Sequence, residues 1–222
     1  MQRFAGRPDL RMSEELDTLI LETASRLFGE QGYAATSVEQ IAAAAQVGKQ
    51  TIYRRHSSKE NLFKRVIFEL GNSFLATAEP LEELASSDPL LALYRTLRML
   101  LDLVLAPETL ALSRTFIAEG WRFPDLVNHA GAHIFESLEN LTSRFLGSVE
   151  EAGLLNGPYH LEETGQMLCG LTLGIPHQKM LFGRGKFETK TERDHYFNGA
   201  WVTFMNGILA SPLPGQFKGA FQ

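Results

Sequence analysis

This chain of 222 residues contains very little cysteine and tryptophan: Cys169 is its single cysteine, and it has two tryptophans. One cysteine cannot form a disulfide within the chain. The first residues, MQRFAGRP, lack the apolar core of a secretory signal peptide, and no apolar run approaches the roughly 18 residues that a membrane span needs. These absences favour a cytoplasmic protein with no membrane-embedded part.

The sequence also lacks the short motifs that carry common catalytic chemistries. It contains no Gly-x-Ser-x-Gly, no phosphate-binding P-loop and no Gly-x-Gly-x-x-Gly, and no pair of acidic residues has a suitable partner. Cys169 lies in the apolar stretch Met-Leu-Cys-Gly-Leu, where a thiol is expected to be inert. We therefore expect no enzymatic activity and no cofactor.

Charge is distributed unevenly along the chain, whose net charge is −5. Residues 36–66 carry six basic and two acidic residues, a net charge of +4, whereas residues 71–222 carry 11 basic and 17 acidic residues, a net charge of −6. A basic segment on an acidic body suits a protein that touches DNA in one place only. Residues 1–12, with Arg3, Arg7 and Arg11, are expected to form a flexible segment, either a solvated tail or an arm that reaches the DNA backbone or minor groove.

Apolar residues recur at helical spacing over most of the chain, and no stretch alternates as a strand would. The first helix is expected to begin at Ser13 and to end at Gly32, and the second to begin at Ser37 with Gln40 completing a capping box. A further helix is expected to start at Ser57 or Ser58. Later helices are expected near 90–105, 108–119, 125–153, 161–181 and 190–209. The pattern predicts an all-α fold of about nine helices.

Residues 47–60, VGKQTIYRRHSSKE, gather the side chains best suited to reading DNA. Arginine can bind a guanine edge with two hydrogen bonds, glutamine can do so with adenine, and all the basic groups can contact phosphates. The upstream helix, 37–45, is joined to this segment by a tight turn at Gln46, where a left-handed backbone would strain a side chain. Two such helices, the second polar and basic, form a helix-turn-helix.

These residues resemble the N-terminal signature of the TetR (tetracycline-repressor) family over residues 13 to about 65. Members commonly have glycine at the position of Gln46 and often phenylalanine at that of His56. The resemblance implies a three-helix DNA-binding domain at residues 1–60, with its arm at 1–12, and a helical ligand-binding and dimerisation domain at 61–222. It rests on Thr36-Ser37-Val38, Ile41-Ala42, Ala45, Val47, Thr51-Ile52-Tyr53, Ser58-Lys59-Glu60 and Leu62.

The resemblance also implies which residues contact DNA: Ser37, Lys49, Gln50, Thr51, Tyr53, Arg54, Arg55 and Lys59. Helical spacing independently places Lys49, Gln50, Tyr53 and Arg54 on one face, and turns Thr51, Ile52 and Arg55 toward the core or its rim. The alternative is an ordinary charged helix face. We expect His56 to be packed inside the domain rather than to contact DNA.

Aromatic and sulfur-containing side chains are frequent between residues 99 and 182, and most are expected to form the core. Because family members bind small effectors between their C-terminal helices, some of these residues are expected to line an apolar cavity. The candidates are Met99, Phe116, Trp121, Phe135, Met167 and Met180. Polar groups for the ligand could come from Arg98, Arg114, Glu119 or Arg122.

The last two long helices carry a wide apolar stripe and small residues that permit close helix packing. As in the family, they are expected to form a four-helix interface in a homodimer, the alternative being packing within one chain. The residues expected there are Gly170, Gly174, Phe197, Trp201, Phe204 and Ile208. Pro176 should kink or end the first of these helices.

His129 and His133 stand one helical turn apart, with Glu136 following, and this spacing can hold a metal. No cysteine cluster or His-Glu-x-x-His supports a metal site, so an exposed helix face is the favoured interpretation. The sequence thus predicts a ligand-responsive repressor that leaves a palindromic operator when it binds a small apolar or aromatic effector. The alternatives are a metal-responsive regulator of the same fold and a helical scaffold that has lost DNA binding.

Overall fold

The computed structural model describes residues 10–212, with only the backbone described at positions 10, 79, 126, 127 and 130. Regular structure in that range is helical, apart from one isolated bridge between Leu155 and Leu209, so the predicted all-α class is confirmed. Eleven α-helices are found there, two more than expected, because a single-turn helix is added and one long predicted helix is divided. None of the described helices is long and apolar enough to cross a membrane. The predicted contacts of Arg3 and Arg7 lie outside the described residues.

Four helices make up the N-terminal part: α1 (Leu10–Ala35), α2 (Val38–Ala44), α3 (Lys49–His56) and α4 (Lys59–Ala78). Helix α1 begins at Leu10, which corrects the predicted start: Ser13 lies inside α1, and its hydroxyl accepts a hydrogen bond from Arg55 instead of capping the helix. Gly32, with φ of 80°, interrupts α1 where its end was predicted. The segment 10–12 is therefore helical rather than part of a flexible arm.

The predicted turn chemistry of the helix-turn-helix is confirmed. The Ser37 hydroxyl accepts a hydrogen bond from the Gln40 amide at 3.2 Å, and the Gln40 side chain accepts one from the Ser37 amide at 2.6 Å. Gln46 has a φ of 55°, the left-handed conformation that favours glycine. The Ser58 hydroxyl accepts a hydrogen bond from the Asn61 amide at 3.0 Å and so caps α4.

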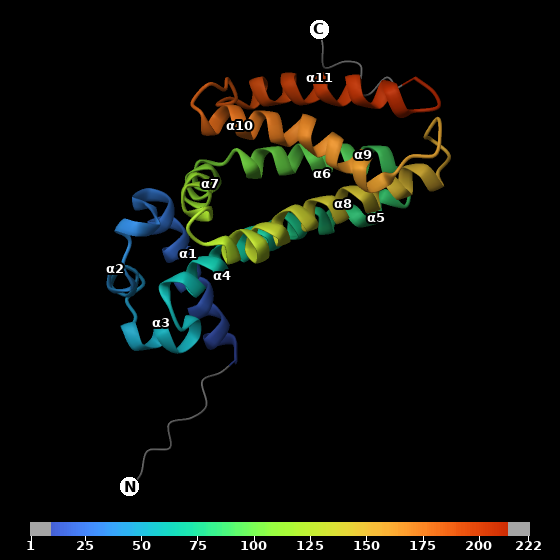
Figure 1. Cartoon of the computed structure of the whole chain (residues 1–222). Coiled ribbons are helices and arrows are strands. Elements are labelled where there is room, and N and C mark those ends of the chain that lie inside the picture. The colour runs from blue at the N-terminus through green and yellow to red at the C-terminus, as the bar shows by residue number, and fades with distance from the viewer. Residues whose placement is uncertain (1–9, 213–222) are drawn as a thin grey trace.

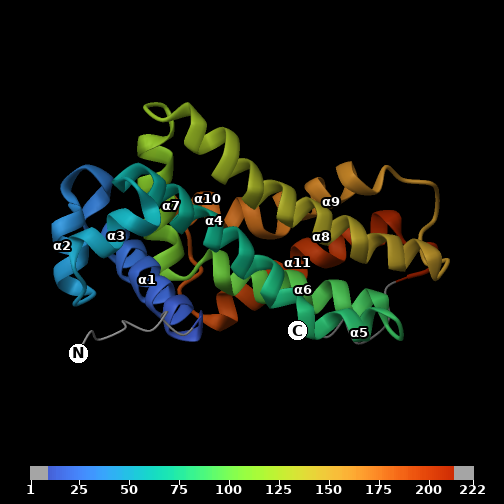
Figure 2. The same ribbon diagram turned by 90° about the horizontal axis from the view of Figure 1, so that it is seen from below.

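The rest of the chain forms a longer bundle (Figures 1 and 2). It begins with two short helices, the 3-10 helix η1 (Glu79–Leu81) and α5 (Glu82–Ala85). These are followed by α6 (Pro89–Val104) and α7 (Pro107–Gly120). A π-helical segment, η2 (Leu126–Gly131), precedes α8 (Ala132–Glu151). The last elements are α9 (Leu161–Cys169), the π-helical η3 (Gly170–Gly174), α10 (Ile175–Leu181) and α11 (Lys190–Ile208). Figure 1 shows the N-terminal helices at one end and α11 along the opposite edge.

Pro176 explains why the predicted helix 161–181 is divided into α9, η3 and α10. Proline has no amide hydrogen, and inside an α-helix its ring collides with the carbonyl four residues earlier. The wider turn of a π-helix relieves that collision. Segment η3 ends two residues before Pro176, which then occupies the first turn of α10.

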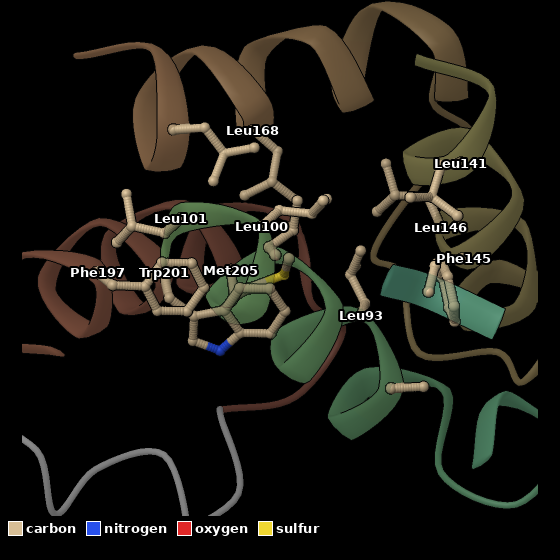
Figure 3. Close-up of a cluster of buried hydrophobic side chains, with 14 of the residues drawn as sticks. Leu93, Leu100, Leu101, Leu141, Phe145, Leu146, Leu168, Phe197, Trp201 and Met205 are labelled. Atoms are coloured by element: carbon tan, nitrogen blue, oxygen red, sulfur yellow. The ribbon is translucent and has the colours of Figure 1, made fainter. Parts of the chain in front are cut away.

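The C-terminal bundle has its own core, formed by α6, α8, α9 and α11 (Figure 3). Phe197 and Trp201 on α11 are 0% exposed and lie in this core beside Leu100, Leu101 and Met205. This placement corrects the prediction that Phe197 and Trp201 contact a second subunit: both side chains are covered by helices of their own chain. Ile208 is also buried, and Phe204 is partly buried against the same core.

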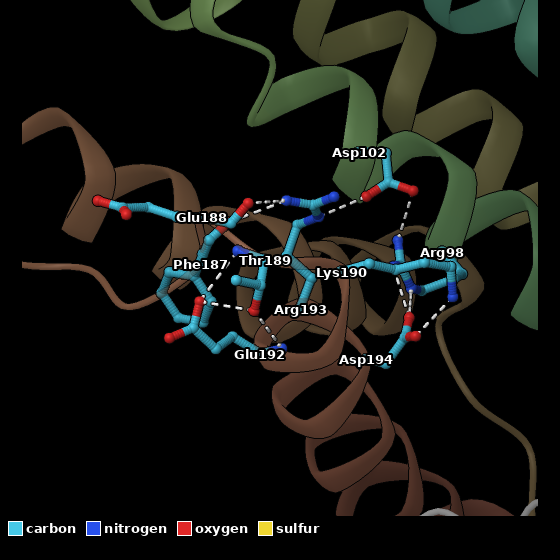
Figure 4. Close-up of polar contacts among 9 residues, drawn as sticks. All are labelled: Arg98, Asp102, Phe187, Glu188, Thr189, Lys190, Glu192, Arg193 and Asp194. Atoms are coloured by element: carbon cyan, nitrogen blue, oxygen red, sulfur yellow. Dashed lines mark hydrogen bonds and ion pairs between the residues drawn. The ribbon is translucent and has the colours of Figure 1, made fainter.

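An ion-pair network fixes α11 on α6 (Figure 4). The Arg98 Nε donates a hydrogen bond to Asp194 at 2.7 Å, and its guanidinium lies 2.9 Å from Asp102. Asp102 in turn accepts a hydrogen bond from the Arg193 Nε at 2.6 Å. Thr189 and Glu192 form a capping box at the start of α11. Arg98 is therefore engaged in holding the two helices together.

Helix α4 belongs to both cores. Leu62, Phe63 and Val66 pack in the N-terminal core, whereas Phe74 and Ala78 pack in the C-terminal one. The predicted domain boundary at residues 60 and 61 falls in the first turn of this helix. One continuous helix therefore packs in both parts of the protein.

Candidate nucleic-acid interface and apolar cavity

The short helix α3 presents an exposed polar and basic face. Lys49, Gln50, Tyr53 and Arg54 are all exposed on it, as their helical spacing predicted. Ile52, on the opposite face, is 1% exposed and anchors α3 in the N-terminal core. The side chains that could reach DNA are thus held on a rigid support.

Lys49 is paired with Glu39 of α2 at this surface. A hydrogen bond between the two side chains raises the pKa of Lys49 and lowers that of Glu39. The Lys49 ammonium also lies 5.5 Å from the centre of the Tyr53 ring. A phosphate that approaches this face competes with Glu39 for Lys49.

Arg55 and Lys59 point into the domain. The Arg55 guanidinium donates a hydrogen bond to the Ser13 hydroxyl at 3.0 Å and lies 3.5 Å from Asp17, both on α1. The Lys59 ammonium donates to the carbonyls of Tyr33 and Thr36 at 2.8 and 2.9 Å, and burial lowers its pKa. Both side chains connect elements of the helix-turn-helix unit; helical spacing had placed Arg55 toward the core or its rim, whereas the inward direction of Lys59 was not predicted.

The other residues of this surface have mainly structural positions. Ser37 caps α2, and Thr51 is partly buried. His56 is 8% exposed and lies 3.1 Å from Asp17, so it is packed inside the domain, as expected. Burial lowers the pKa of His56, and the nearby Asp17 carboxylate opposes this effect.

An apolar cavity of about 350 Å³ lies among α4, α6, α7, α8 and the α9–η3–α10 segment. Of the six residues predicted to line it, Phe116 and Phe135 do so. Trp121 and Met167 are 79% and 64% exposed outside it. Met99 is exposed on α6, and Met180 packs against the C-terminal core. The arginines 98, 114 and 122 and Glu119 do not line it either.

The polar side chains of this cavity were not identified from the sequence. They are Thr109 and Ser113 on α7, Glu139 on α8, Gln166 on α9 and His177 on α10. The His177 Nε2 lies 3.2 Å from the Ser113 hydroxyl. Burial, followed by the charge of Arg114, lowers the pKa of His177, so its ring is neutral at pH 7. No local spacing signals such a set, because Ser113 and His177 are far apart in the chain.

Cys169 also lines the cavity. Its Sγ lies 3.1 Å from the Thr142 hydroxyl, and burial raises the pKa of the thiol to about 11. The thiol is therefore protonated at neutral pH, and it is not a nucleophile there.

His129 and His133 do not form a joint site. The His133 ring stacks on Phe68 at 3.8 Å, and its Nε2 lies 2.9 Å from the Asn72 side-chain oxygen. The His129 ring instead contacts the carbonyl of Asp125 at 3.0 Å. Across the described residues, no group of three histidine, cysteine or acidic side chains is placed to hold a metal ion. The metal-responsive alternative thus has no support.

Family models match both parts of this arrangement. Residues 20–66 match the model of bacterial regulatory proteins of the tetR family, and residues 91–207, more than half of the chain, match the C-terminal domain of AefR-like transcriptional repressors. The chain belongs to the TetR family of transcriptional regulators. The predicted resemblance is confirmed, and it extends through the C-terminal bundle.

Individual relatives agree with this assignment. The chain is 28% identical over 196 residues to the transcriptional regulator AcrR of Shigella flexneri, which covers 86% of this chain and 90% of AcrR. It is 40% identical over 99 residues to the regulator TcmR of Streptomyces glaucescens, covering 45% of this chain and 42% of TcmR. Several further curated relatives match over about a third of their own length. A crystal structure of a TetR-family regulator from Mesorhizobium loti superposes with a TM-score of 0.80 at 26% identity, covering 89% of this chain and 98% of that one.

Proposed function

We propose that this chain is a ligand-responsive transcriptional repressor that binds a palindromic operator as a homodimer in the cytoplasm. The observation that carries the proposal is α4, which begins three residues after the end of α3 and whose Leu70 and Phe74 line the apolar cavity. A small molecule in the cavity contacts the same helix that supports the recognition helix. The effector is a small apolar or aromatic compound.

The DNA-binding step is tested by selecting bound sequences from a random duplex pool with purified protein. A palindromic consensus is expected, since a dimer presents two copies of α3 to successive major grooves. Affinity should fall steeply with salt, by about 0.9 log units per log unit of salt for each phosphate contacted. No consensus, or a slope near zero, would refute the proposal.

The release step follows from how α8 packs on α4. His133 of α8 lies between Phe68 and Asn72 of α4, and the next residue, Ile134, lines the cavity. A ligand that displaces Ile134 moves His133 and therefore α4. Since the two half-sites have a fixed separation, a shift of either recognition helix weakens operator binding. The effector should release operator DNA over the same concentration range in which it raises the melting temperature.

The dimer surface is proposed on the exposed face of the α9–η3–α10 segment together with α11. Met167 and Phe182 are 64% and 73% exposed on that segment, and Gly170 and Gly174 are exposed between them. Small residues in such a stripe permit close approach of a second helix. Ile208 is buried in the core of its own chain and Phe204 packs against that core, so neither belongs to this surface.

Met167→Glu tests this surface, with Met99→Glu on α6 as the matched control. Both methionines are exposed in the protomer, so neither change should unfold it. Light scattering should show monomers for Met167→Glu and dimers for Met99→Glu. Dimers in both variants would place the interface elsewhere.

A further inference from the structure

We propose that the cavity selects its ligand by charge: it accepts a mainly apolar molecule whose polar groups are cationic or neutral, and it rejects anions such as carboxylates. The inference rests on the proposed function in taking this cavity as the effector site. It adds the chemical class of the effector, which the fold alone does not give.

The charge of the cavity wall carries the argument. Among the described residues that line it, Glu139 is the only acidic side chain, and there is no lysine or arginine. Arg114 is close enough for its charge to act on His177, but it is exposed, it does not line the cavity, and its guanidinium donates a hydrogen bond to the Met180 carbonyl at 3.2 Å. An anion in this cavity would therefore lose its hydration, meet no opposite charge in the wall and face a like charge.

The polar groups come from different helices around an otherwise apolar cavity. His177 of α10 faces Ser113 of α7. Glu139 of α8 and Gln166 of α9 also line the cavity, each about one helical turn before a member of the Thr142–Cys169 contact.

Gln166 and His177 are eleven residues apart on the α9–η3–α10 segment, so they lie in different parts of the cavity wall. Phe74, Phe116 and Leu173 contribute apolar surface to the same wall. The neutral His177–Ser113 pair can give and accept hydrogen bonds, so it suits a hydroxyl, carbonyl or ether, whereas Glu139 suits an amine or hydroxyl.

Three probes on one skeleton test the charge rule directly: 9-(aminomethyl)anthracene, 9-anthracenemethanol and 9-anthracenecarboxylate. They share the anthracene ring with one small substituent at the same position, and they are cationic, neutral and anionic at pH 7. Binding is measured by fluorescence titration of the full chain. The amine should bind at least about tenfold more tightly than the carboxylate, because an ionic hydrogen bond in a partly buried site is replaced by like-charge repulsion.

Glu139→Gln removes the negative charge and keeps the size of the side chain, so it distinguishes the effect of charge from that of cavity shape. Glu136→Gln is the control. Glu136 is exposed on the same helix and does not line the cavity. Glu139→Gln should reduce the amine-to-carboxylate affinity ratio by about tenfold, and Glu136→Gln should leave it unchanged. Thermal unfolding of both variants reports whether either has lost its fold.

The proposal is overturned if the carboxylate binds wild-type protein as tightly as the amine, if the ratio is the same in Glu139→Gln, or if none of the three probes binds. These outcomes are independent of operator binding, because the titrations contain no DNA. If the protein binds the probes in the expected order but selects no operator, the proposed repressor function is refuted, whereas the proposed charge selectivity of the cavity stands.

Discussion

Replacement of Gly71 by alanine tests the contact through which the cavity is proposed to act on α4. A Cβ atom at this position would lie 2.7 Å from Cδ2 and 3.2 Å from Nε2 of His133 on α8. The imidazole cannot move away freely, because it stacks on Phe68 and its Nε2 pairs with the Asn72 side chain. Helices α4 and α8 must therefore separate, or the stacked ring must leave its position.

Overpacking of this kind costs about 1–3 kcal/mol. In a chain of this size, each kcal/mol lowers the melting temperature by roughly 2–4 °C. Gly147→Ala is the matched control: it adds the same methyl group within α8, where the nearest side-chain atom would be at 3.8 Å, an ordinary contact. This control should leave stability unchanged or raise it by up to ~1 kcal/mol, because alanine is the better helix former.

The double variant Gly71→Ala with His133→Ala decides whether the clash is the cause. His133→Ala alone loses the stacking and the contact with Asn72, but in the double variant the added methyl group has room. The two changes should therefore be less than additive, by at least ~1 kcal/mol in the free energy of unfolding. Additivity within about 0.3 kcal/mol, or a Gly71→Ala variant as stable as Gly147→Ala, would refute the described α4–α8 contact.

Four further outcomes are expected. Glu39→Gln should tighten operator binding about two- to fivefold, measured by fluorescence anisotropy, because it frees Lys49 and removes an acid from the DNA-facing surface. Gln46→Gly should raise thermal stability by up to ~1 kcal/mol, since φ is 55° there, and a decrease would contradict the strain argument. The lowered pKa of buried His56 means that the folded state binds fewer protons than the unfolded chain, so stability should fall as pH drops below about 6.5, and less so in His56→Phe. Lys59→Ala should cost at least ~1 kcal/mol in stability, because it removes two hydrogen bonds to backbone carbonyls. Tyr53→Ala should cost less than ~0.5 kcal/mol and still weaken operator binding, because Tyr53 is exposed. Equal melting temperatures of the two variants would contradict this distinction.

The helix-turn-helix could be predicted from the sequence because its determinants are local. The capping box of Ser37 and Gln40 spans three residues, and the left-handed turn depends on one position, Gln46. The inward face of α3 is set by the spacing around Ile52. Each of these features depends on residues that are close together in the sequence, so it could be predicted without knowing how distant parts of the chain pack.

The C-terminal bundle was predicted less well, because an apolar stripe shows that a helix is covered but does not identify what covers it. Phe197 and Trp201 could have faced a second subunit, but they are 0% exposed in their own chain. Met167, by contrast, was expected in the cavity and is 64% exposed. A helix packed among three others buries residues on several faces. The spacing of apolar residues shows which faces are buried, but it does not show which helix covers each face.

Arg55 and Lys59 show that charge and family position do not reveal in which direction a basic side chain points. Both belong to the basic segment, and both were expected at the interface, but their donors are directed at Ser13, Tyr33 and Thr36 inside the unit. A cation that satisfies carbonyls inside a small domain holds its helices in place, and we expect Arg55 and Lys59 to support operator affinity in this indirect way. If Lys59→Ala loses operator binding, the cause is a distorted helix-turn-helix, and the melting temperature should fall as well. If Tyr53→Ala loses operator binding, the cause is a lost contact between the exposed face of α3 and DNA, and the melting temperature should not change.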